Sequence, residues 1–371
     1  MPELRSARRR LAALAWCGLG PALALGCAHA APVPCEAVGR MPGTEDFDRL
    51  PPRGDRALVV SSQPRRGAEA RSDGQLWHVD LEAGTAEPLP LHGRDACSFR
   101  PHGLSTVQRI GGAWEVYVVV HHLAGDATRE GCDLEHADAT APLDSIERYR
   151  WHDDGLHFVE RLRDPQMTNL NDVHAIADGR LWVSNNPAWP TPRALVVDLL
   201  FGRRRGQVLL YRPVERRWSV AADRMLFPNG VLADETGEHL LVTAARGRVR
   251  LLALDGGGEA AGVARRGRAR GTLDNLLRDD HGRAITTGHP SGPAFVRHVK
   301  SSAAIAPTEV FTVELDARHP RKLRTARVLR VDDGRVDAGS VALPVGEAVA
   351  VGQVYEAGVM VCRPGAQAPA P

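Results

Sequence analysis

Short apolar runs, many of them alternating or rich in β-branched residues, recur along most of the chain. They lie at residues 57–60, 114–120, 180–183, 208–211, 240–242, 309–315 and 348–354. Asp-Gly pairs fall between such runs, and these residue types tolerate the positive φ of a tight hairpin turn. Residues 148–151 and 156–160 flank Asp154-Gly155 and predict one clean hairpin. The pattern is typical of β-strands, because long stretches with helical periodicity are scarce.

Many short strands separated by regular turns indicate a sandwich, a barrel or a propeller. The chain has 371 residues, and no linker divides it beyond residue 30. A single all-β domain of this length favours a six-bladed β-propeller over residues 31–371, with about 57 residues in each four-stranded blade. The polar residues 125–143 interrupt the strand pattern, and we interpret them as a long loop.

A second interruption, residues 193–205, begins at Arg193, holds two short apolar runs and ends with Arg203, Arg204 and Arg205. An apolar patch beside arginines is able to rest on a membrane surface or to roof a pocket. The alternative is an ordinary covered loop with a solvated basic turn. The sequence leaves both interpretations open.

Composition narrows the class of partner. The chain is 43% hydrophobic and 25% charged, and its formal net charge is +2. These values exclude a disordered chain, a strongly basic nucleic-acid-binding protein and a polytopic membrane protein. A small molecule is the expected ligand, and the sequence does not predict an oligomeric state.

The first 30 residues have the features of a secretory signal peptide. Arginines precede an apolar run at residues 11–25, and Ala28-His29-Ala30 forms an A-x-A cleavage site. The run is too short to span a bilayer comfortably. We therefore expect export to the periplasm or secretion. In the alternative, Ala24-Leu25-Gly26-Cys27 acts as a lipobox and Cys27 carries a lipid anchor.

Four cysteines remain after cleavage, at positions 35, 97, 132 and 362, and they allow three pairings. Cys35 and Cys362 lie near the two ends of the mature chain, so a disulfide between them would join the termini of a closed ring. Closing so long a loop contributes on the order of 5 kcal/mol. Cys97 and Cys132 would then be left over, and the sequence does not settle their pairing. A zinc site is the alternative, but the cysteines form no C-x-x-C motif and have no neighbouring histidine pair with zinc spacing.

Common enzyme signatures are absent from the sequence: there is no G-x-S-x-G, no H-E-x-x-H, no P-loop and no G-x-G-x-x-G after a strand. The chain instead has groups of Asn, Asp and Glu at predicted strand ends, nearly one group for each blade. They are Glu45-Asp46, Asn171-Asp172, Asn229 and Asp274-Asn275. Each alone is a common turn motif, but side-chain oxygens of these types are the ligands that calcium prefers. Together they predict a metal site on the central axis.

These residues carry a resemblance to the paraoxonase/arylesterase family of calcium-dependent lactonases. That family is one of the six-bladed propellers, which also include gluconolactonases and strictosidine-synthase-like proteins. The matching segments keep the family's order over nearly the whole mature chain, at residues 43–46, 100–106, 171–173, 227–230, 273–275 and 288–290. The most specific of them is Pro-His-Gly-Leu-Ser-Thr at residues 101–106.

The resemblance implies two calcium ions in a central tunnel. The catalytic ion would be held by Glu45, Asn171, Asn229, Asp274 and Asn275. A second, structural ion would be held by Asp46, Asp172 and the backbone carbonyl of Leu104. Neighbouring side chains of an extended strand point to opposite sides, so each doublet would serve both ions. Two carboxylates and three amides would leave the catalytic ion able to polarise a carbonyl.

The family also places a histidine pair above the catalytic ion, and His102 and His122 map to its two members. The expected reaction is the hydrolysis of a lactone or an aryl ester. His102 would take a proton from water, and His122 would relay the proton and orient its partner. His121 should face the other way, because side chains alternate along a strand. A carboxylate ligand acting as base or nucleophile is the alternative.

His289 and Phe227 are expected to line the substrate pocket, and two departures from the family pattern affect the same wall. Asn186 stands where an aspartate is usual, and Val296 stands where an aromatic residue is expected. Two other functions stay open. One is a sugar lactonase of the gluconolactonase kind with one divalent ion, against which His102 argues. The other is a non-catalytic propeller that binds a ligand and holds calcium for structure only.

Overall fold

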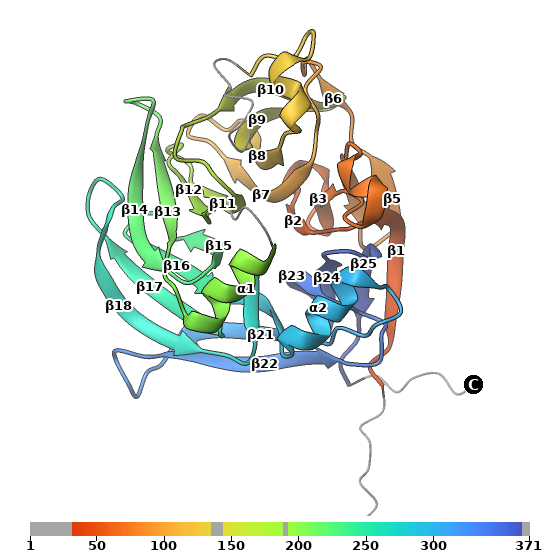
Figure 1. The fold of residues 1–371 in the computed structure, drawn as a ribbon, viewed down its shortest axis with the longest axis vertical. Helices are drawn as coiled ribbons and strands as arrows, with labels where there is room; N and C mark the ends of the chain where they lie inside the picture. The colour runs from red at the N-terminus through yellow and green to blue at the C-terminus, as the bar shows by residue number, and fades with distance from the viewer. Residues whose placement is uncertain (1–31, 135–143, 188–191, 366–371) are drawn as a thin grey trace, which may run out of the picture. The chain divides into compact units, whose positions relative to one another are not determined.

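The computed structural model describes residues 32–134, 144–187 and 192–365. Contacts group the residues from Pro32 onward into one compact unit. Within this unit six sheets form a ring, which confirms the predicted six-bladed β-propeller (Figure 1). The fold is mostly rather than purely β, because the described residues also form helices α1 (Pro192–Phe201) and α2 (Gly292–Lys300). The predicted signal peptide and residues 135–143 of the predicted loop lie outside the described residues.

Each blade runs from an inner strand outward. The first blade holds β2 (Asp46–Arg49), β3 (Ala57–Ser62), β4 (Gln75–Asp80) and β5 (Thr85–Pro88). The second holds β7 (Pro101–Gln108), β8 (Trp114–His121), β9 (Asp144–His152) and β10 (Gly155–Leu162), with the short β6 (Leu91–His92) beside β10. The third holds β11 (Leu170–Ala175), β12 (Leu181–Asn185), β13 (Gly206–Arg212) and β14 (Arg217–Met225).

The remaining blades follow the same plan. The fourth holds β15 (Pro228–Ala233), β16 (His239–Ala244), β17 (Arg248–Leu254) and β18 (Ala260–Arg268). The fifth holds β19 (Thr272–Arg278), β20 (Ala284–His289), β21 (Thr308–Leu315) and β22 (Leu323–Val331). The sixth holds β23 (Gly339–Val345), β24 (Ala348–Gln353), β25 (Ala357–Cys362) and, as its outer strand, β1 (Cys35–Pro42). Short 3-10 helices at Pro51–Arg53, Gly67–Arg71 and Ala124–Thr128 lie in the connections.

The ring closes where β1 completes the last blade. Cys35 pairs in register with Cys362, and the two form a disulfide with their Cα atoms 4.0 Å apart. The expected link between the ends of the ring is therefore confirmed. Cys97 and Cys132 form the second disulfide, which settles the pairing that the sequence left open. Two disulfides are consistent with an extracellular location.

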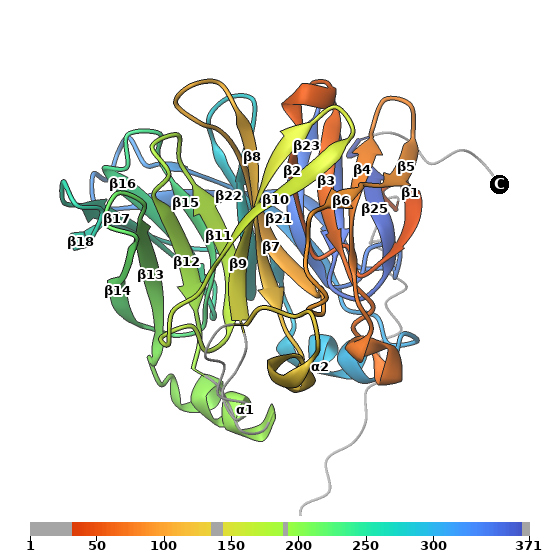
Figure 2. The same cartoon turned by 90° about the horizontal axis from the view of Figure 1, so that it is seen from above.

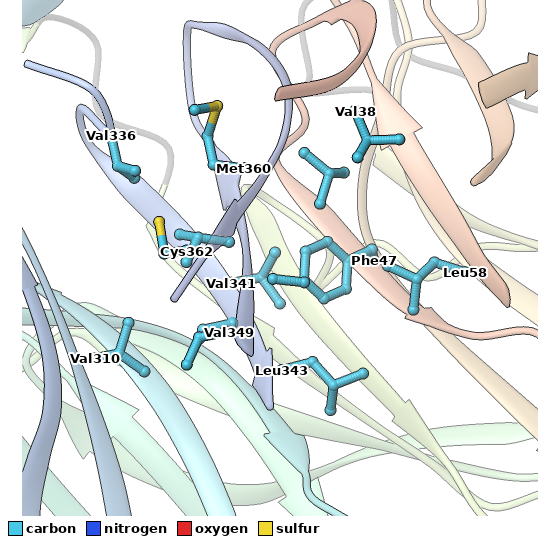
Figure 3. Packing of buried hydrophobic residues seen from close by; sticks show 14 of the residues in the cluster. Val38, Phe47, Leu58, Val310, Val336, Val341, Leu343, Val349, Met360 and Cys362 are labelled. Atoms are coloured by element: carbon cyan, nitrogen blue, oxygen red, sulfur yellow. The ribbon is translucent and has the colours of Figure 1, made fainter. Parts of the chain in front are cut away.

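Apolar packing seals the junction between the first and the last blade. Phe47 and Leu58 of the first blade are buried against Val341 and Met360 of the last, and Val38 of β1 joins them (Figure 3). Burial of such side chains contributes roughly 1.5–3 kcal/mol each. The junction is thus held by a hydrophobic core, by strand pairing and by a disulfide.

Helices α1 and α2 lie at the same end of the ring, which is the end where the inner strands begin (Figure 2). The register shows this directly. Leu170 at the start of β11 pairs with Asn185 at the end of β12, and Thr272 at the start of β19 pairs with His289 at the end of β20. The predicted site residues occupy these same strand ends, so the fold gathers them at one end of the propeller.

The two disulfides close loops of very different length, and this generates a test. They span 327 and 35 residues. Loop-closure entropy then predicts that the double change Cys35→Ser and Cys362→Ser lowers the free energy of unfolding by about 2 kcal/mol more than Cys97→Ser with Cys132→Ser. Urea denaturation of both variants measures the difference. An equal loss, or a greater loss from the shorter loop, would contradict ring closure as the stabilising role of the first bond.

Candidate functional site

The predicted metal ligands and His102 lie on or beside inner strands. Glu45 directly precedes β2, while His102 lies on β7 and Asn171 on β11. Asn229 lies on β15, and Asp274 lies on β19. Neighbouring inner strands contact each other around the ring. Residues far apart in the sequence therefore meet at one end of the axis.

The inner strands are irregular at this height. Register shifts fall between Pro101 and Leu104, Leu170 and Val173, Pro228 and Val231, and Leu273 and Leu276. A bulge changes the direction of the side chains it contains. His102, Asn171, Asn229 and Asp274 lie inside these shifts, so they do not follow the simple alternation of a regular strand.

Two glycines of the sequence motifs allow neighbouring inner strands to touch. A Cβ atom on Gly103 would lie 2.3 Å from the carbonyl oxygen of Asn171. One on Gly230 would lie 2.7 Å from the carbonyl oxygen of Asp274. Any other residue would push the strands apart at these points. The glycines of Pro-His-Gly and Pro-Asn-Gly are therefore required by the close approach of the blades.

Several buried side-chain oxygens at this end have no hydrogen-bond partner among the described residues. They are Glu45 Oε2, Asn171 Oδ1, Asn229 Oδ1, Asp274 Oδ1 and Asn275 Oδ1. An unpaired buried acceptor costs about 1–3 kcal/mol. Carboxylate and amide oxygens are also the donors that calcium takes. Asn186 Oδ1 at the same level is also unpaired, and the set contains every predicted ligand of the catalytic ion, so these residues fit such an ion.

Contacts between blades tie the same residues together. Asn275 Nδ2 donates to the backbone oxygen of Glu45 over 3.2 Å, and the hydroxyl of Ser340 donates to that oxygen over 2.5 Å. His102 Nε2 lies 3.4 Å from Glu45 Oε1, and His289 Nε2 lies 2.9 Å from Asp274 Oδ2. Burial raises the pKa of Glu45 to about 8; Arg65 opposes the shift and Asp274 adds to it. The carboxylates of Glu45 and Asp274 therefore repel each other in one buried region.

Asp46 and Asp172, the predicted ligands of the structural ion, have a different environment. Asp46 Oδ2 accepts the backbone N–H of Leu104 over 2.7 Å, which joins β2 to β7. Asp172 Oδ2 accepts that of Val231 over 2.8 Å, which joins β11 to β15. Burial, and then the charge of Asp172, raise the pKa of Asp46 well above its usual range. Both carboxylates therefore already connect blades, and the second ion stays a prediction.

His102 lies beside Glu45 in this group, with Nε2 3.4 Å from Glu45 Oε1. Arg65 Nη1 donates to His102 Nδ1 over 2.9 Å. Burial and the charge of Arg65 hold the pKa of His102 well below its usual range, so the ring is neutral. Arg65 also lies 3.9 Å from Glu45 Oε2. No motif in the sequence pointed to Arg65.

The ring beside His102 belongs to His121, not to His122. Their ring centroids are 5.0 Å apart in an edge-on arrangement. Pro101 pairs with Val120, and the register shift that follows on β7 brings the ring of His102 to that of His121. The expected alternation of the two adjacent histidines is right, but the member that faces His102 is the other one.

Each of the two adjacent histidines has its own partners. His121 Nδ1 lies 2.9 Å from Asp144 Oδ1. Burial opposes the charged form of Asp144, but His121 and hydrogen bonds outweigh it and lower the pKa of this carboxyl. His122 Nδ1 donates to the backbone oxygen of Ser98 over 3.0 Å, and its Nε2 lies 2.8 Å from Ser145 Oγ. Burial lowers the pKa of His122 to about 4.

An aromatic wall flanks the site, and sequence reasoning missed its members. The ring of Phe295 on α2 lies 4.5 Å from that of His289 and 6.2 Å from that of Tyr355. The neighbouring Val296 is 46% exposed. The sequence predicted that Val296 replaces an aromatic residue at this wall. Phe295 on α2 provides the aromatic ring instead, because it is Phe295 that contacts His289. Phe227, half-buried with a φ of 50°, precedes β15.

Asn186, the other departure, lies just beyond the end of β12. Its Nδ2 donates to the backbone oxygen of Pro228 over 3.1 Å. Its Oδ1 is buried and has no hydrogen-bond partner among the described residues. A neutral amide here can donate to Pro228, which a carboxylate could not do. Asn186 thus connects the third and fourth blades at the level of the site.

Helix α1 carries exposed apolar side chains at this end of the ring. Leu200 is 70% exposed and Phe201 is 76% exposed, and Asp198 bonds Arg205. Contact of residues 193–205 with a membrane surface stays a prediction. In the part of the chain that the structure describes, no helix has the length and apolarity to cross a bilayer.

Comparisons with known proteins agree with this geometry. The sequence profile of the Arylesterase family matches residues 42–362. Human serum paraoxonase/arylesterase 1 is 25% identical over 207 residues, which are 54% of this chain and 53% of that protein. The match thus spans about half the length of this curated relative.

Solved structures share the fold. A luciferin-regenerating enzyme is 10% identical with a TM-score of 0.53, over 91% of this chain and 98% of that one. The PQQ-bound aldose sugar dehydrogenase from Streptomyces coelicolor is 12% identical with a TM-score of 0.52, over 90% of this chain and 99% of that one. Identities this low support the fold alone. The profile match covers most of the sequence, and the chain therefore belongs to the arylesterase family.

Proposed function

We propose that this protein is a calcium-dependent hydrolase of lactones and aryl esters. The observation that carries the proposal is the set of buried, unpaired oxygens of Glu45, Asn171, Asn229, Asp274 and Asn275 beside the neutral His102. Membership of the arylesterase family supports an ester hydrolase. A hard cation is the partner that satisfies such a set of oxygens.

The five residues would hold a calcium ion, which when bound supplies a positive charge that polarises the carbonyl of the substrate. Glu45 and Asp274 contribute two negative charges, and the three asparagines contribute none. His289 lies 2.9 Å from Asp274 Oδ2 and holds this carboxylate in place. The backbone oxygen of Glu45, held by Asn275 and Ser340, fixes the start of β2.

His102 serves as the base in the proposed reaction. The acceptor nitrogen of the neutral ring is Nδ1, to which Arg65 donates. When the attacking water takes the place of Arg65 there, the ring can accept its proton while the water oxygen bonds to the acyl carbon. Arg65 makes the protonated ring unfavourable, so the proton is held only briefly and passes to the leaving alkoxide. The nearby His121, bonded to Asp144, orients His102 through the edge-on contact of the two rings. We therefore assign the partner role to His121 in place of His122.

The wall of Phe295 and Tyr355 favours substrates with an apolar acyl or aryl group over hydroxyl-rich sugars. This argues against a sugar lactonase. A structural calcium at Asp46, Asp172 and Leu104 also belongs to the proposal. Contact of residues 193–205 with a membrane is a further part of it. So is export through residues 1–30, with lipidation of Cys27 as the alternative; the two disulfides support an oxidising compartment.

Removal of the metal tests the proposal directly. A calcium chelator should abolish the hydrolysis of phenyl acetate and of an aliphatic lactone, and added calcium should restore it, because the ion is the group that polarises the carbonyl. A spectrophotometric ester assay and a pH-stat lactone assay measure both rates. Full activity in excess chelator would refute the metal mechanism. Calcium-dependent stability in a protein inert toward both substrates would favour a non-catalytic propeller.

The change Asn229→Ala should weaken calcium binding at least about tenfold, because it removes one oxygen of the set. Isothermal titration with calcium measures the affinity. Asn185→Ala is the matched control, since Asn185 Oδ1 already accepts the backbone N–H groups of Thr168 and Asn169. Equal affinities of the two variants would remove Asn229 from the ligand set.

Substitution of the histidines separates their roles. His102→Gln should lower kcat about a hundredfold or more, as loss of a general base does. His121→Ala should lower kcat at least about tenfold with little change in KM, and added imidazole should restore part of it. His122→Ala should leave kcat nearly unchanged while lowering the melting temperature, because its partners lie in the protein core. Steady-state kinetics with calcium in excess provides the comparison. A larger loss of kcat from His122→Ala than from His121→Ala would reverse the assignment.

A further inference from the structure

Metal-binding side chains also gather at the outer edge of the second blade, away from the inner strands. His92 lies on β6, His152 ends β9, Asp154 lies in the turn that follows, and His157 lies on β10. Ligand atoms of His92, Asp154 and His157 all lie within 4.8 Å of one another. None of these residues takes part in the proposed hydrolysis.

The strand register explains why three histidines meet there. β6 pairs in parallel with β10 and places His92 opposite His157. β9 pairs with β10 in the antiparallel sense and places Arg150 opposite His157, so His152 is the diagonal neighbour on the same face. Three adjacent strands thus present an imidazole each on one face of the sheet.

The side chains are already close in space. His157 Nε2 lies 2.9 Å from Asp154 Oδ1, and His92 Nε2 lies 3.8 Å from Asp154 Oδ2. Ring centroids are 4.7 Å apart for His92 and His157, and 4.4 Å apart for His152 and His157. Small rotations of these partly exposed side chains would bring the nitrogens to the spacing of a common ion.

A glycine permits the approach of β6. A Cβ atom on Gly155 would lie 2.6 Å from the carbonyl oxygen of Pro90 and 3.2 Å from His92 Nε2. Arg150, on the same face, forms an ion pair with Glu115: its Nη2 lies 3.3 Å from Glu115 Oε1. The imidazoles of His92 and His157 face the carboxylate of Asp154, and the ring of His152 lies against that of His157.

We propose that His92, His152, Asp154 and His157 form a surface site for a divalent transition metal, zinc in the first place. Three imidazole nitrogens and one carboxylate oxygen are a common tetrahedral zinc set. Imidazole suits zinc and copper, whereas calcium takes oxygen ligands, so this site and the axial oxygens select different ions. A bound ion would cross-link the short β6 to the hairpin of β9 and β10, and would thereby stabilise the edge of the blade.

Zinc titration of the untagged full-length protein, with calcium in excess to saturate oxygen sites, tests the proposal. We expect one equivalent of zinc to bind and to raise the melting temperature. His157→Ala and His92→Ala should each weaken this binding at least about tenfold. His319→Ala is the matched control, because His319 forms the same kind of exposed pair with Asp316, over 3.0 Å, without a further histidine.

Electron paramagnetic resonance with copper provides a second readout. Copper in the wild-type protein should show hyperfine coupling to several imidazole nitrogens, and the coupling should be reduced in His157→Ala. The site would be overturned if the wild-type protein bound no zinc in the presence of excess calcium. It would also be overturned if wild type, His92→Ala and His157→Ala bound zinc with equal affinity. Ester hydrolysis in calcium should be unchanged in both variants, so failure here is distinct from failure of the proposed hydrolase.

Discussion

The structure depends on one constraint: carboxylate and amide oxygens are buried on the axis where the inner strands touch. Gly103 and Gly230 bring backbones of adjacent blades into contact. At the same level, Asn171 Oδ1, Asn229 Oδ1 and Asp274 Oδ1 have no hydrogen-bond partner among the described residues. Each unpaired oxygen opposes folding. The disulfide and the apolar junction of the first and last blades hold the ring closed against this cost, and a cation on the axis would remove it.

Each doublet of the sequence combines an unpaired oxygen with a hydrogen bond between blades. In Asn171-Asp172 the first residue leaves its oxygen unpaired, while the second accepts the backbone N–H of Val231 on the next blade. Asp46 does the same for Leu104. Bonds between a carboxylate and a backbone amide thus fix the spacing of the inner strands, and that spacing places the free oxygens. Loss of either kind of residue would disturb the other.

Much of the fold and of the candidate ligand set could be predicted because the sequence signals for both are short motifs of neighbouring residues. Short strands, Asp-Gly turns and the end-to-end cysteines indicate a closed ring, and Pro-His-Gly marks an inner strand. The partner of His102 could not be predicted, since it depends on the pairing of Pro101 with Val120. Phe295 was missed because it lies on a helix that follows the motif, and His92 meets His157 only through a strand of two residues.

The adjacent histidines show how one register serves two needs. His121 turns to the axis, where its Nδ1 lies 2.9 Å from Asp144 Oδ1. His122 turns to the core and stays neutral, because it donates to the oxygen of Ser98 and lies 2.8 Å from the hydroxyl of Ser145. Ser98 follows Cys97, whose disulfide anchors the same loop. The residue that a motif would assign to catalysis therefore supports the rim of the site, and its neighbour is in the position to act on His102.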